Sequence, residues 1–507
     1  AGGGVVVAGQ ITTVETDYTG ELNGNHSGDN WGYRTGDPND NEVTVNAVVK
    51  VTGDVRGGYY FNKDGKVTNN IVTINGTVTK AVYGGESGRG YDVMGNQVTV
   101  TGTVGENVYG GRVRGGDGTA TGNTVTVNGG TINMNVYGGY SFRGDAEKNT
   151  VTIEGGEVEH VYGGNSTGGD VLENEVYIQG GTVKHNVYGG FANENEKKAE
   201  ANEVTISGGE VSGHVYGGHS DSGQATNNKV TISGGVVRGQ VYGGETFGSM
   251  ENATGNEVTI NSGTVLLDVY GGDARFGGAA HNHVIIKGKV SGRVYGGRSS
   301  NPSDGGWNKV EILGGTVDSD VYGDFKNSCN NTVVLHDATV GGSVCGDAEL
   351  HDDTGNTLIL SGSSTVNDSV NNFETIEFDG EKFSWDTTKT VLTANQFSNP
   401  DCTLDVTALV NKTGTGTMTL LSSGRENDFE TLKLAYNTAT QATPVTLDSS
   451  KTSQVVKAGT TKTSEDKGII IAYNENEHTV SLDAANNYKN VNYTIANNVN
   501  KITLGTI

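Results

Sequence analysis

Ten tyrosines recur along the chain at nearly regular intervals, each following a valine and preceding a glycine. Rings repeated at the spacing of stacked β-strands, about 4.8 Å, could bind sugar rings or peptide ligands on their faces. Alternatively, the rings stack on one another or are covered by loops and stabilise the fold, and we favour this interpretation. The candidate ligand-binding residues are Tyr83, Tyr109, Tyr137, Tyr162, Tyr188, Tyr216, Tyr242, Tyr270, Tyr295 and Tyr322.

The carboxylates of the repeated segments are spaced poorly for catalysis. Asp268 and Asp320 occupy the same outward position two repeats apart, with Arg293 between them. That separation is roughly 10 Å at strand spacing, too far for two carboxylates to share a proton or a metal ion directly. Glu154, Glu157 and Glu159 crowd a single repeat, and the 10 histidines show no metal-ligand spacing. We therefore predict a protein that is not an enzyme, with no cofactor and no metal.

Two short motifs match functional patterns by chance. Residues 164–168 fit the G-x-S-x-G pattern of a nucleophilic serine. That pattern requires a strand–turn–helix context, whereas Gly-Gly-x-Ser recurs here in several repeats. Residues 37–42 superficially resemble a calcium loop but lack the central glycine and terminal glutamate of the EF-hand pattern. We interpret the first as a turn and the second as a loop.

These residues belong to a sequence repeat, of which residues 202–218 (N-E-V-T-I-S-G-G-E-V-S-G-H-V-Y-G-G) are a representative copy. From Asn70 onward, 13 or 14 steps separate each repeated asparagine from the tyrosine position. Between 9 and 14 steps then lead to the next asparagine. One half of the repeat is therefore a fixed scaffold and the other half a variable loop, as in stacked coils with loops on one side.

The scaffold half predicts β-strands whose apolar side chains point inward. Alternate positions are apolar, and one column is nearly all valine from Val43 to Val333 before it ends in Leu358. A single repeat has about four inward apolar side chains, too few for a core of its own, so the repeats must stack on one another. We predict an all-β protein, a parallel β-solenoid of about 13 coils, with the right-handed β-helix as the expected form.

Two further features of the repeat concern polar and turn residues. The repeated asparagine shares the parity of the core valine, so we expect its side chain at an inner corner, hydrogen-bonded up the stack. Glycine pairs such as Gly208-Gly209 and Gly217-Gly218 are expected where the chain turns, because glycine accepts positive φ. The predicted structural ladder comprises Asn70, Asn96, Asn123, Asn149, Asn174, Asn202, Asn228, Asn256, Asn282 and Asn308.

The chain divides into three expected regions. Residues 1–40 contain N-terminal capping strands, including Val5–Val7 and residues 11–14, and a polar loop with Trp31 and Tyr33. Residues 41–364 form the repetitive solenoid. Residues 365–507 are rich in threonine and asparagine and predict a C-terminal β-rich region, either a cap or continued irregular coils.

Composition limits the classes of partner. With 81 Gly, 4 Pro and only 7% aromatic residues, the chain is typical of turn-rich repetitive β-structure. A formal net charge of −25 argues against nucleic acid and anionic membranes as partners. No segment has the length and apolarity of a membrane helix. Of the three cysteines, Cys329 and Cys345 lie near enough in the repeat for a bridge, which the sequence leaves open.

The coils N-x-V-T-I-x-G-G-x-V-x-x-x-V-Y-G-G and the segment Val370–Phe378 resemble the repetitive passenger regions of bacterial autotransporter-type surface proteins, adhesins among them. The resemblance covers residues 41–378 well and the remainder loosely. It implies export to the surface of a double-membraned bacterium, with no membrane insertion of this segment, and a role in adhesion or surface structure. A host or neighbouring cell's glycan or protein is then the expected partner.

Two other functions stay open at this point. The chain could be a secreted, self-assembling subunit of an extracellular filament or sheath, joined through the terminal strands of residues 1–14 or 490–507. The coils also resemble those of β-helical polysaccharide lyases and hydrolases, and an enzyme of that kind is the least favoured interpretation because its clustered acids are missing. The variable loops are a further candidate surface, since function in repeat proteins tends to lie on loops projecting from one side.

Overall fold

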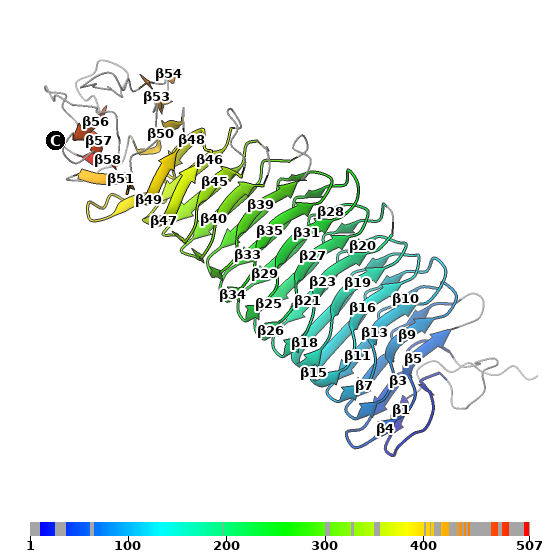
Figure 1. Ribbon diagram of the computed structural model, residues 1–507. Coiled ribbons are helices and arrows are strands. Elements are labelled where there is room, and N and C mark those ends of the chain that lie inside the picture. Colours follow the sequence, from blue (N-terminus) through cyan, green and yellow to red (C-terminus); the bar gives the residue numbers. More distant parts are fainter. Residues whose placement is uncertain are drawn as a thin grey trace, which may run out of the picture. The chain divides into compact units, whose positions relative to one another are not determined.

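The computed structural model is all-β, a parallel β-solenoid of about 13 turns followed by an irregular C-terminal region (Figure 1), which confirms the predicted fold class. Right-handedness stays a prediction. Contacts divide the chain into two compact units, Ala1–Asn282 (unit 1) and His283–Ile507 (unit 2). The structure describes residues 11–25, 37–60, 65–194, 196–299, 305–325, 329–348 and 355–399, and the segments 402–405, 407–409, 417–424, 433–435, 437–438, 441–442, 445–446, 468–474, 479–485 and 501–505.

A full coil of unit 1 contains four strands, each paired in parallel with the same strand of the next coil. Alternate residues of the first strand are buried, so its valine and isoleucine side chains point inward. Val204 pairs with Val230 and Tyr216 with Tyr242, one coil apart. The four strands of the representative coil are β25 (Glu203–Ile206), β26 (Glu210–Val211), β27 (Val215–Ser220) and β28 (Ala225–Thr226).

The coil repeats this order through unit 1. The other first strands are β3 (Glu42–Val45), β7 (Ile71–Ile74), β11 (Gln97–Val100), β15 (Thr124–Ile132), β18 (Thr150–Val158), β21 (Glu175–Ile178), β29 (Lys229–Ile232) and β33 (Glu257–Ile260). β15 and β18 also run through the second position, whose other strands are β4 (Lys50–Val51), β8 (Thr77–Val78), β12 (Thr103–Val104), β22 (Thr182–Val183), β30 (Val236–Val237) and β34 (Thr264–Val265).

The third and fourth strands flank the variable loops. The other third strands are β5 (Val55–Tyr60), β9 (Val82–Ser87), β13 (Val108–Val113), β16 (Val136–Ser141), β19 (Val161–Ser166), β23 (Val187–Ala192), β31 (Val241–Thr246) and β35 (Val269–Ala274). The fourth strands form a separate nine-stranded sheet of β6 (Val67–Thr68), β10 (Val93–Met94), β14 (Ala120–Thr121), β17 (Ala146–Glu147), β20 (Val171–Leu172), β24 (Ala199–Glu200), β28, β32 (Ala253–Thr254) and β36 (Ala279–Ala280).

Unit 2 has coils of its own, in which three strand positions recur. Its first strands are β37 (His283–Ile286), β40 (Lys309–Leu313), β43 (Thr332–His336) and β46 (Thr357–Ser361). The second strands are β38 (Lys289–Val290), β41 (Thr316–Val317) and β44 (Thr339–Val340), and the third are β39 (Val294–Ser299), β42 (Val321–Asp324) and β45 (Val344–Asp347).

Parallel pairing continues beyond residue 364, where the solenoid is expected to end. That boundary falls at the start of β47, which pairs with β44 and β45 before it and with β49 after it. Among the strands that the structure describes, antiparallel pairs are found from β51 onward, as between β51 and β58. The elements are β47 (Ser364–Asn371), β48 (Thr375–Phe378), β49 (Thr390–Ser398), β50 (Thr403–Asp405), the 3₁₀ turn η2 (Thr407–Leu409), β51 (Thr417–Ser423), β52 (Lys433–Ala435), β53 (Asn437–Thr438), β54 (Gln441–Ala442), β55 (Val445–Thr446), β56 (Gly468–Asn474), β57 (Thr479–Ala485) and β58 (Lys501–Gly505).

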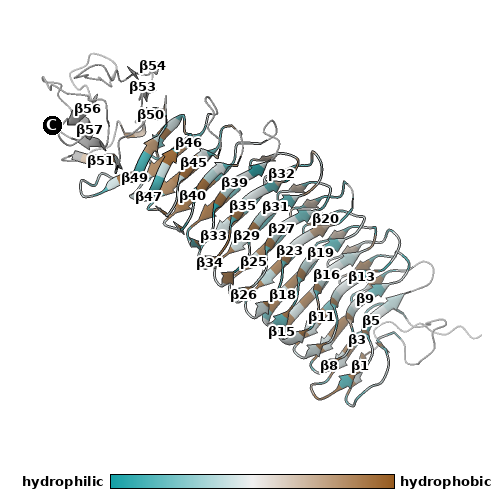
Figure 2. Cartoon of the chain, viewed as in Figure 1, coloured by the Kyte–Doolittle hydropathy of each residue, from teal (hydrophilic) through white to brown (hydrophobic). Residues whose placement is uncertain are grey.

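The core of each unit is a set of stacked apolar columns. Figure 2 shows hydrophobic and hydrophilic residues alternating along the strands. Val204 and Ile206 are 0% exposed, as are Val211 and Val215 at the second and third strands. Each coil therefore buries about four aliphatic side chains, and each such side chain contributes roughly 1.5–3 kcal/mol when it is removed from water.

One of the two glycine expectations is wrong. Gly209 has φ of +74° and lies in a turn, as expected. Gly217 and Gly218 instead lie inside β27. A Cβ on Gly217 would lie 2.4 Å from the carbonyl oxygen of Gly243, and one on Gly218 would lie 2.4 Å from the side chain of Asn228. The second pair is therefore glycine because the strand passes too close to the next coil for any side chain.

The N-terminal strands cap the first coil of unit 1 in part. β1 (Ile11–Val14) pairs in parallel with β3, and β2 (Leu22–Asn23) pairs with β5. Of the residues expected here, Val5–Val7, Trp31 and Tyr33 lie outside the described residues. The described residues contain no helix long and apolar enough to cross a membrane.

Candidate functional site

The repeated tyrosines stack ring on ring at the third strands. In unit 1, successive rings from Tyr83 to Tyr270 have centroids 4.7–5.1 Å apart and interplanar angles of 1–9°. In unit 2, Tyr295 and Tyr322 stack at 5.0 Å and 10°. Parallel strands in register produce this arrangement, because every ring leaves the backbone at the same point of its coil.

Stacking covers the ring faces that a ligand would use. Tyr270 is 2% exposed and Tyr216 is 8% exposed, and five other members of the column are buried to a similar degree. Tyr137, Tyr162 and Tyr322 are half-buried. The column itself therefore covers the ring faces, in line with the favoured interpretation, and a role of these ten tyrosines in ligand binding stays a prediction that would have to use ring edges.

Many of the phenol hydroxyls bond to the residue two positions earlier in the chain. Asn135 Nδ2 donates to the Tyr137 hydroxyl at 3.0 Å, and the Tyr242 hydroxyl donates to Gln240 Oε1 at 2.6 Å. Burial raises the pKa of the Tyr83 hydroxyl to about 12. The column therefore carries neutral phenols at physiological pH and offers no general base.

A second outward column, which the sequence analysis missed, runs beside the tyrosines. It consists of the residue that follows the glycine pair in the third strands of unit 1, and its aromatic members pack edge-on against the rings, as Tyr140 does against Tyr137. Several members are charged and buried. The only signal in the sequence is position, because the residue types vary: Tyr59, Glu86, Arg112, Tyr140, Asn165, Phe191, His219, Glu245 and Asp273.

A buried charge network lies at the start of this column in unit 1. Arg56 occupies a tyrosine position and contacts Glu86 at 2.5 Å, Asp54 at 2.7 Å and Glu21 at 3.2 Å. The Glu86 side chain is 0% exposed, and Arg112 approaches it from the next coil at 3.4 Å. The Arg56 guanidinium also lies 4.9 Å from the centroid of Tyr83, which makes this network an extension of the ring stack.

A second buried network centres on His219. Its Nδ1 lies 2.8 Å from Glu245 Oε2 and its Nε2 lies 3.0 Å from Asp221 Oδ1. The imidazole stacks on Phe191 at 4.8 Å and 8°. Burial opposes protonation, but the two carboxylate hydrogen bonds outweigh it and raise the pKa of His219. His219 is 5% exposed, whereas the side chain of Asp221 at the edge of the cluster is 42% exposed, so the ring itself is closed off from solvent.

The repeated asparagines form a hydrogen-bonded ladder at an inner corner. Asn202 Nδ2 donates to Asn228 Oδ1 at 3.0 Å and to the Val171 carbonyl at 3.0 Å, while its Oδ1 accepts from the side chain and backbone N–H of Asn174. Both amide hydrogens are used. The pattern holds for Asn70, Asn96, Asn123, Asn149, Asn174, Asn202, Asn228 and Asn256; Asn282 also donates to a fourth-strand carbonyl, and Asn308 donates to Asp324.

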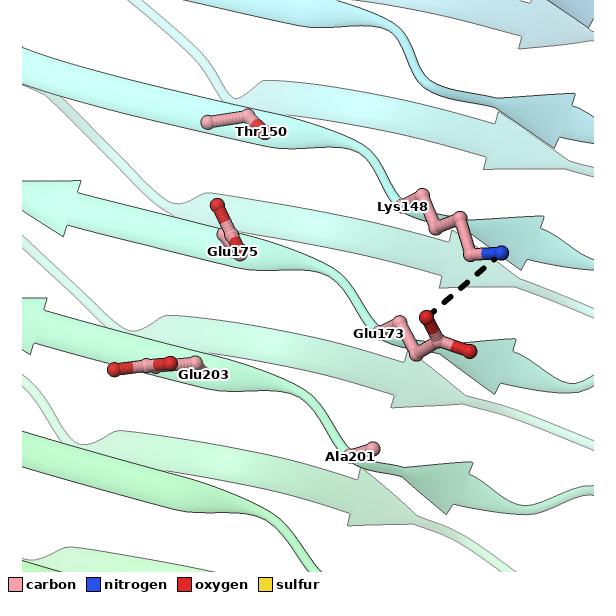
Figure 3. A pocket seen from close by; sticks show the side chains of 6 residues that line it. All are labelled: Lys148, Thr150, Glu173, Glu175, Ala201 and Glu203. Carbon is pink, nitrogen blue, oxygen red and sulfur yellow. Dashed lines mark ion pairs between the residues drawn. The ribbon is translucent and has the colours of Figure 1, made fainter.

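An open depression lies on the outer side of the first strands. It has a volume of about 340 Å³ and is lined by residues from three coils, and Figure 3 shows the outward carboxylates of Glu175 and Glu203 beside the Lys148–Glu173 ion pair. The nitrogen–oxygen distance of that pair is 3.8 Å. Glu175 accepts a hydrogen bond from the Tyr177 hydroxyl. Among the described residues, no group of three His, Cys, Asp or Glu is arranged to hold a metal ion.

Three of the acids considered for catalysis, Glu157, Glu159 and Asp320, are engaged in ion pairs, and Asp268 accepts a hydrogen bond from the Tyr270 hydroxyl at 3.1 Å. Lys184 contacts both Glu157 and Glu159, the latter at 3.2 Å. In unit 2, Arg293 Nε lies 3.4 Å from Asp320 Oδ2. These pairs neutralise the carboxylates at the surface rather than setting two of them against one reacting atom.

The serine motif and the cysteines have structural positions. Ser166 lies in β19, where its hydroxyl donates to the Gly144 carbonyl at 2.8 Å and accepts from the Gly169 N–H. The motif is therefore the end of a strand and a turn. Cys329, Cys345 and Cys402 are free thiols, so no bridge joins Cys329 to Cys345.

A comparison with protein-family models, curated proteins and solved structures finds no match to this chain. The β-solenoid architecture is shown by the structure, and any function must be argued from the residues described above.

Proposed function

We propose that this chain is a non-catalytic β-solenoid that acts outside the cell or at the cell surface of a double-membraned bacterium, as an adhesin or surface-structural protein. The autotransporter-like repeat supports this proposal. The contacts of the repeated side chains support it as well, because the tyrosine rings stack on one another and the asparagine amides hydrogen-bond along the ladder. Residues with these contacts stabilise the scaffold, and the sequence differences between repeats lie in its loops.

The observation that carries the proposal is the way the variable loops are held. The loop at residues 114–119 lies between β13 and β14, and the loop at 193–198 lies between β23 and β24. On one side of these loops the third strands pair in register, and on the other side the fourth strands do so. Loops of different sequence are therefore presented by one regular frame, the arrangement that repeat proteins use for recognition.

Adhesion of protein-coated beads to cells tests the proposal. We expect beads carrying the full chain to be retained, and retention to fall when single loops are replaced by the short segment Thr167–Asp170 from between β19 and β20. A matched control changes Thr205 to serine on an outward strand position. Retention that is absent, or that survives replacement of every loop, would contradict the proposal, and unchanged thermal unfolding would show that the variants remain folded.

The filament alternative is supported by β1. Ile11 on this strand is 75% exposed, and the strand pairs with β3 on one edge. By contrast, β58 already pairs with both β51 and β57. Joining of copies would therefore use residues 1–14 rather than 490–507. Negative-stain microscopy of the intact chain and of a chain lacking residues 1–14 separates the alternatives: filaments that vanish on truncation would support assembly, and discrete particles in both samples would exclude it.

A further inference from the structure

An open hollow of about 280 Å³ lies on the outer side of strands β40, β43, β46 and β48 in unit 2. Val334, Ile359 and Glu377 line it from one register position, each one coil further along. We propose that this site, called the unit 2 hollow, binds a small organic amine whose ammonium group contacts Glu377 and whose aliphatic chain lies over Ile359 and Val334. The inference goes beyond the proposed surface function and does not rest on it.

The floor of the unit 2 hollow is apolar at a position that is polar in unit 1. Where β25 and β29 have the outward residues Thr205 and Thr231, β43 and β46 have Val334 and Ile359. Val334 is 4% exposed and Ile359 is half-buried, so Ile359 offers most of the apolar surface that a ligand would cover. Covering it with an aliphatic chain is favourable in proportion to the apolar area removed from water.

The acid at one end of this column already has partners inside the protein. Glu311 precedes Val334 at the same register position. Its Oε1 lies 2.7 Å from His283 Nε2 and 2.8 Å from Lys309 Nζ. The hydrogen bond with His283 is the largest cause that lowers the pKa of Glu311, to about 2. Glu311 is therefore ionised and neutralised by its neighbours, and a ligand cation would gain little from it.

The acid at the other end, Glu377, lacks such partners. Among the residues that the structure describes, none forms a hydrogen bond or an ion pair with its carboxylate. The side chain is half-buried, and Asp405 follows it in register on the next coil. Burial, and after it the negative charge of Asp405, raises the pKa of Glu377. An ammonium group placed here would be attracted by both carboxylates and would favour the ionised form of Glu377.

A tight turn after β48 forms one side of the unit 2 hollow. Asp379 Oδ1 accepts the N–H groups of Glu381 and Lys382 at 3.0 and 3.2 Å, and Lys382 Nζ lies 3.6 Å from Asp379 Oδ2. The lysine of this turn is thus paired with the aspartate of the same turn. Two lysines face three carboxylates in the lining as a whole, which leaves one negative charge in excess. The charge of the hollow therefore favours a cation, as does the net charge of −25 of the whole chain.

The column also limits the size and kind of ligand. Glu377 and Val334 are two coils apart, roughly 10 Å at strand spacing, which suits an amine with an extended chain of about six carbons. A divalent metal ion such as Ca²⁺ takes several oxygen ligands, whereas the neighbour of Glu377 on the floor is the aliphatic Ile359. An alkylamine uses both the carboxylate and the apolar floor.

Ligand-observed NMR titration of the full chain tests the inference with four probes: n-hexylamine, n-butylamine, n-hexanol and hexanoate. We expect hexylamine to bind most tightly, butylamine to bind more weakly because it buries fewer methylene groups, and hexanoate not to bind. Glu377→Gln should weaken hexylamine binding by about tenfold or more, since it removes a charge-assisted hydrogen bond, and should leave hexanol binding unchanged. The double variant Val334→Thr, Ile359→Thr, which introduces the residue type of unit 1, should weaken both hexylamine and hexanol.

The matched control is Glu203→Gln, which removes an outward carboxylate of unit 1 and should leave hexylamine binding unchanged. Equal losses in Glu377→Gln and Glu203→Gln would overturn the inference, because they would show a general effect of charge. Hexylamine that fails to bind the intact chain, that binds no better than hexanoate, or that still binds the Glu377→Gln chain at full strength would overturn it as well. Thermal unfolding of each variant shows that it remains folded, and the result leaves the test of adhesion by coated beads unaffected.

Discussion

Asn308 Nδ2 donates a hydrogen bond to Asp324 Oδ2 at 2.7 Å in the interior of unit 2, where the two residues are 1% and 0% exposed. In unit 1 the corresponding hydrogen goes to a carbonyl of the nine-stranded sheet, as Asn256 Nδ2 does to Ala225 at 2.9 Å. The last strand of that sheet is β36. Asp324 stands where earlier repeats have the second glycine of V-Y-G-G, so a carboxylate supplies the acceptor that the backbone supplies elsewhere.

Changing Asp324 to glycine restores the common repeat sequence but should destabilise unit 2. The Asn308 amide would lose its acceptor inside the core, and an unsatisfied buried donor costs about 1–3 kcal/mol. The measurement is the free energy of unfolding by denaturant. Asp324→Asn keeps an oxygen acceptor in a side chain of the same size and should cost less. A glycine variant as stable as the natural chain would show that the carboxylate is not needed.

The stacking of the coils could be predicted from the sequence because it depends on a repeat period and on the alternation of apolar residues along the chain. The Val204 column and the Asn202 ladder follow from parity and period alone. The outward columns could not be predicted in the same way. Two successive glycines, such as Gly217 and Gly218, interrupt the alternation of inward and outward positions, because a side chain on either one would contact the next coil. Because both residues are glycine, the hydropathy of the sequence does not indicate this interruption. The burial of Tyr216 and His219 is therefore seen only in the structure.

Two glycines of one coil should respond oppositely to substitution. A Cβ on Gly111 would lie 2.4 Å from Asn123 Nδ2, so Gly111→Ala should cost about 3 kcal/mol through overpacking and damage to the ladder. Gly122 has φ of +64° and open space around it. Asn69 and Asn227 occupy the equivalent position in other coils with φ of 57°. Gly122→Asn should therefore change stability by no more than about 0.5 kcal/mol.

Thermal unfolding of the two glycine variants at one pH gives this comparison directly. A large loss in Gly122→Asn would mean that its position differs from that of Asn69. A harmless Gly111→Ala would mean that the strand can move away from the ladder.

The tyrosine column should make the fold sensitive to alkali. Burial raises the pKa of Tyr216 and Tyr162 above the ordinary value. The unfolded chain then loses its phenol protons at a lower pH than the folded chain. Stability should therefore fall as pH rises above about 10, by about 1.4 kcal/mol per pH unit for each such tyrosine. Denaturant unfolding between neutral pH and this range measures the slope, and Tyr216→Phe, which keeps the ring, should reduce it. Phenol absorbance showing that the whole column ionises near its ordinary pKa in the folded protein would contradict the prediction.

His219 should stabilise the fold on the acidic side of neutrality. Its raised pKa means that the folded state holds a proton that the unfolded state releases earlier. The stabilisation is fully present below the unfolded value of about 6.5 and is lost as pH rises through the higher folded value. In its charged form the ring donates from Nδ1 to Glu245 and from Nε2 to Asp221. His219→Gln should therefore lower the free energy of unfolding by about 2 kcal/mol near pH 6, with a smaller loss at high pH.

The control for His219 is His214, whose Nδ1 accepts a hydrogen bond from the Gln240 N–H at 2.9 Å. His214 lies five residues earlier, immediately before β27, where its ring packs edge-on against Tyr216. His214→Gln is the matched histidine-to-glutamine change, so the contribution of His219 at each pH between about 5.5 and 8 is the difference in stability between the two variants. If that difference does not change with pH, the imidazole of His219 is neutral in the folded state. The Glu245–His219–Asp221 cluster would then be held by hydrogen bonds of a neutral ring rather than by an ion pair.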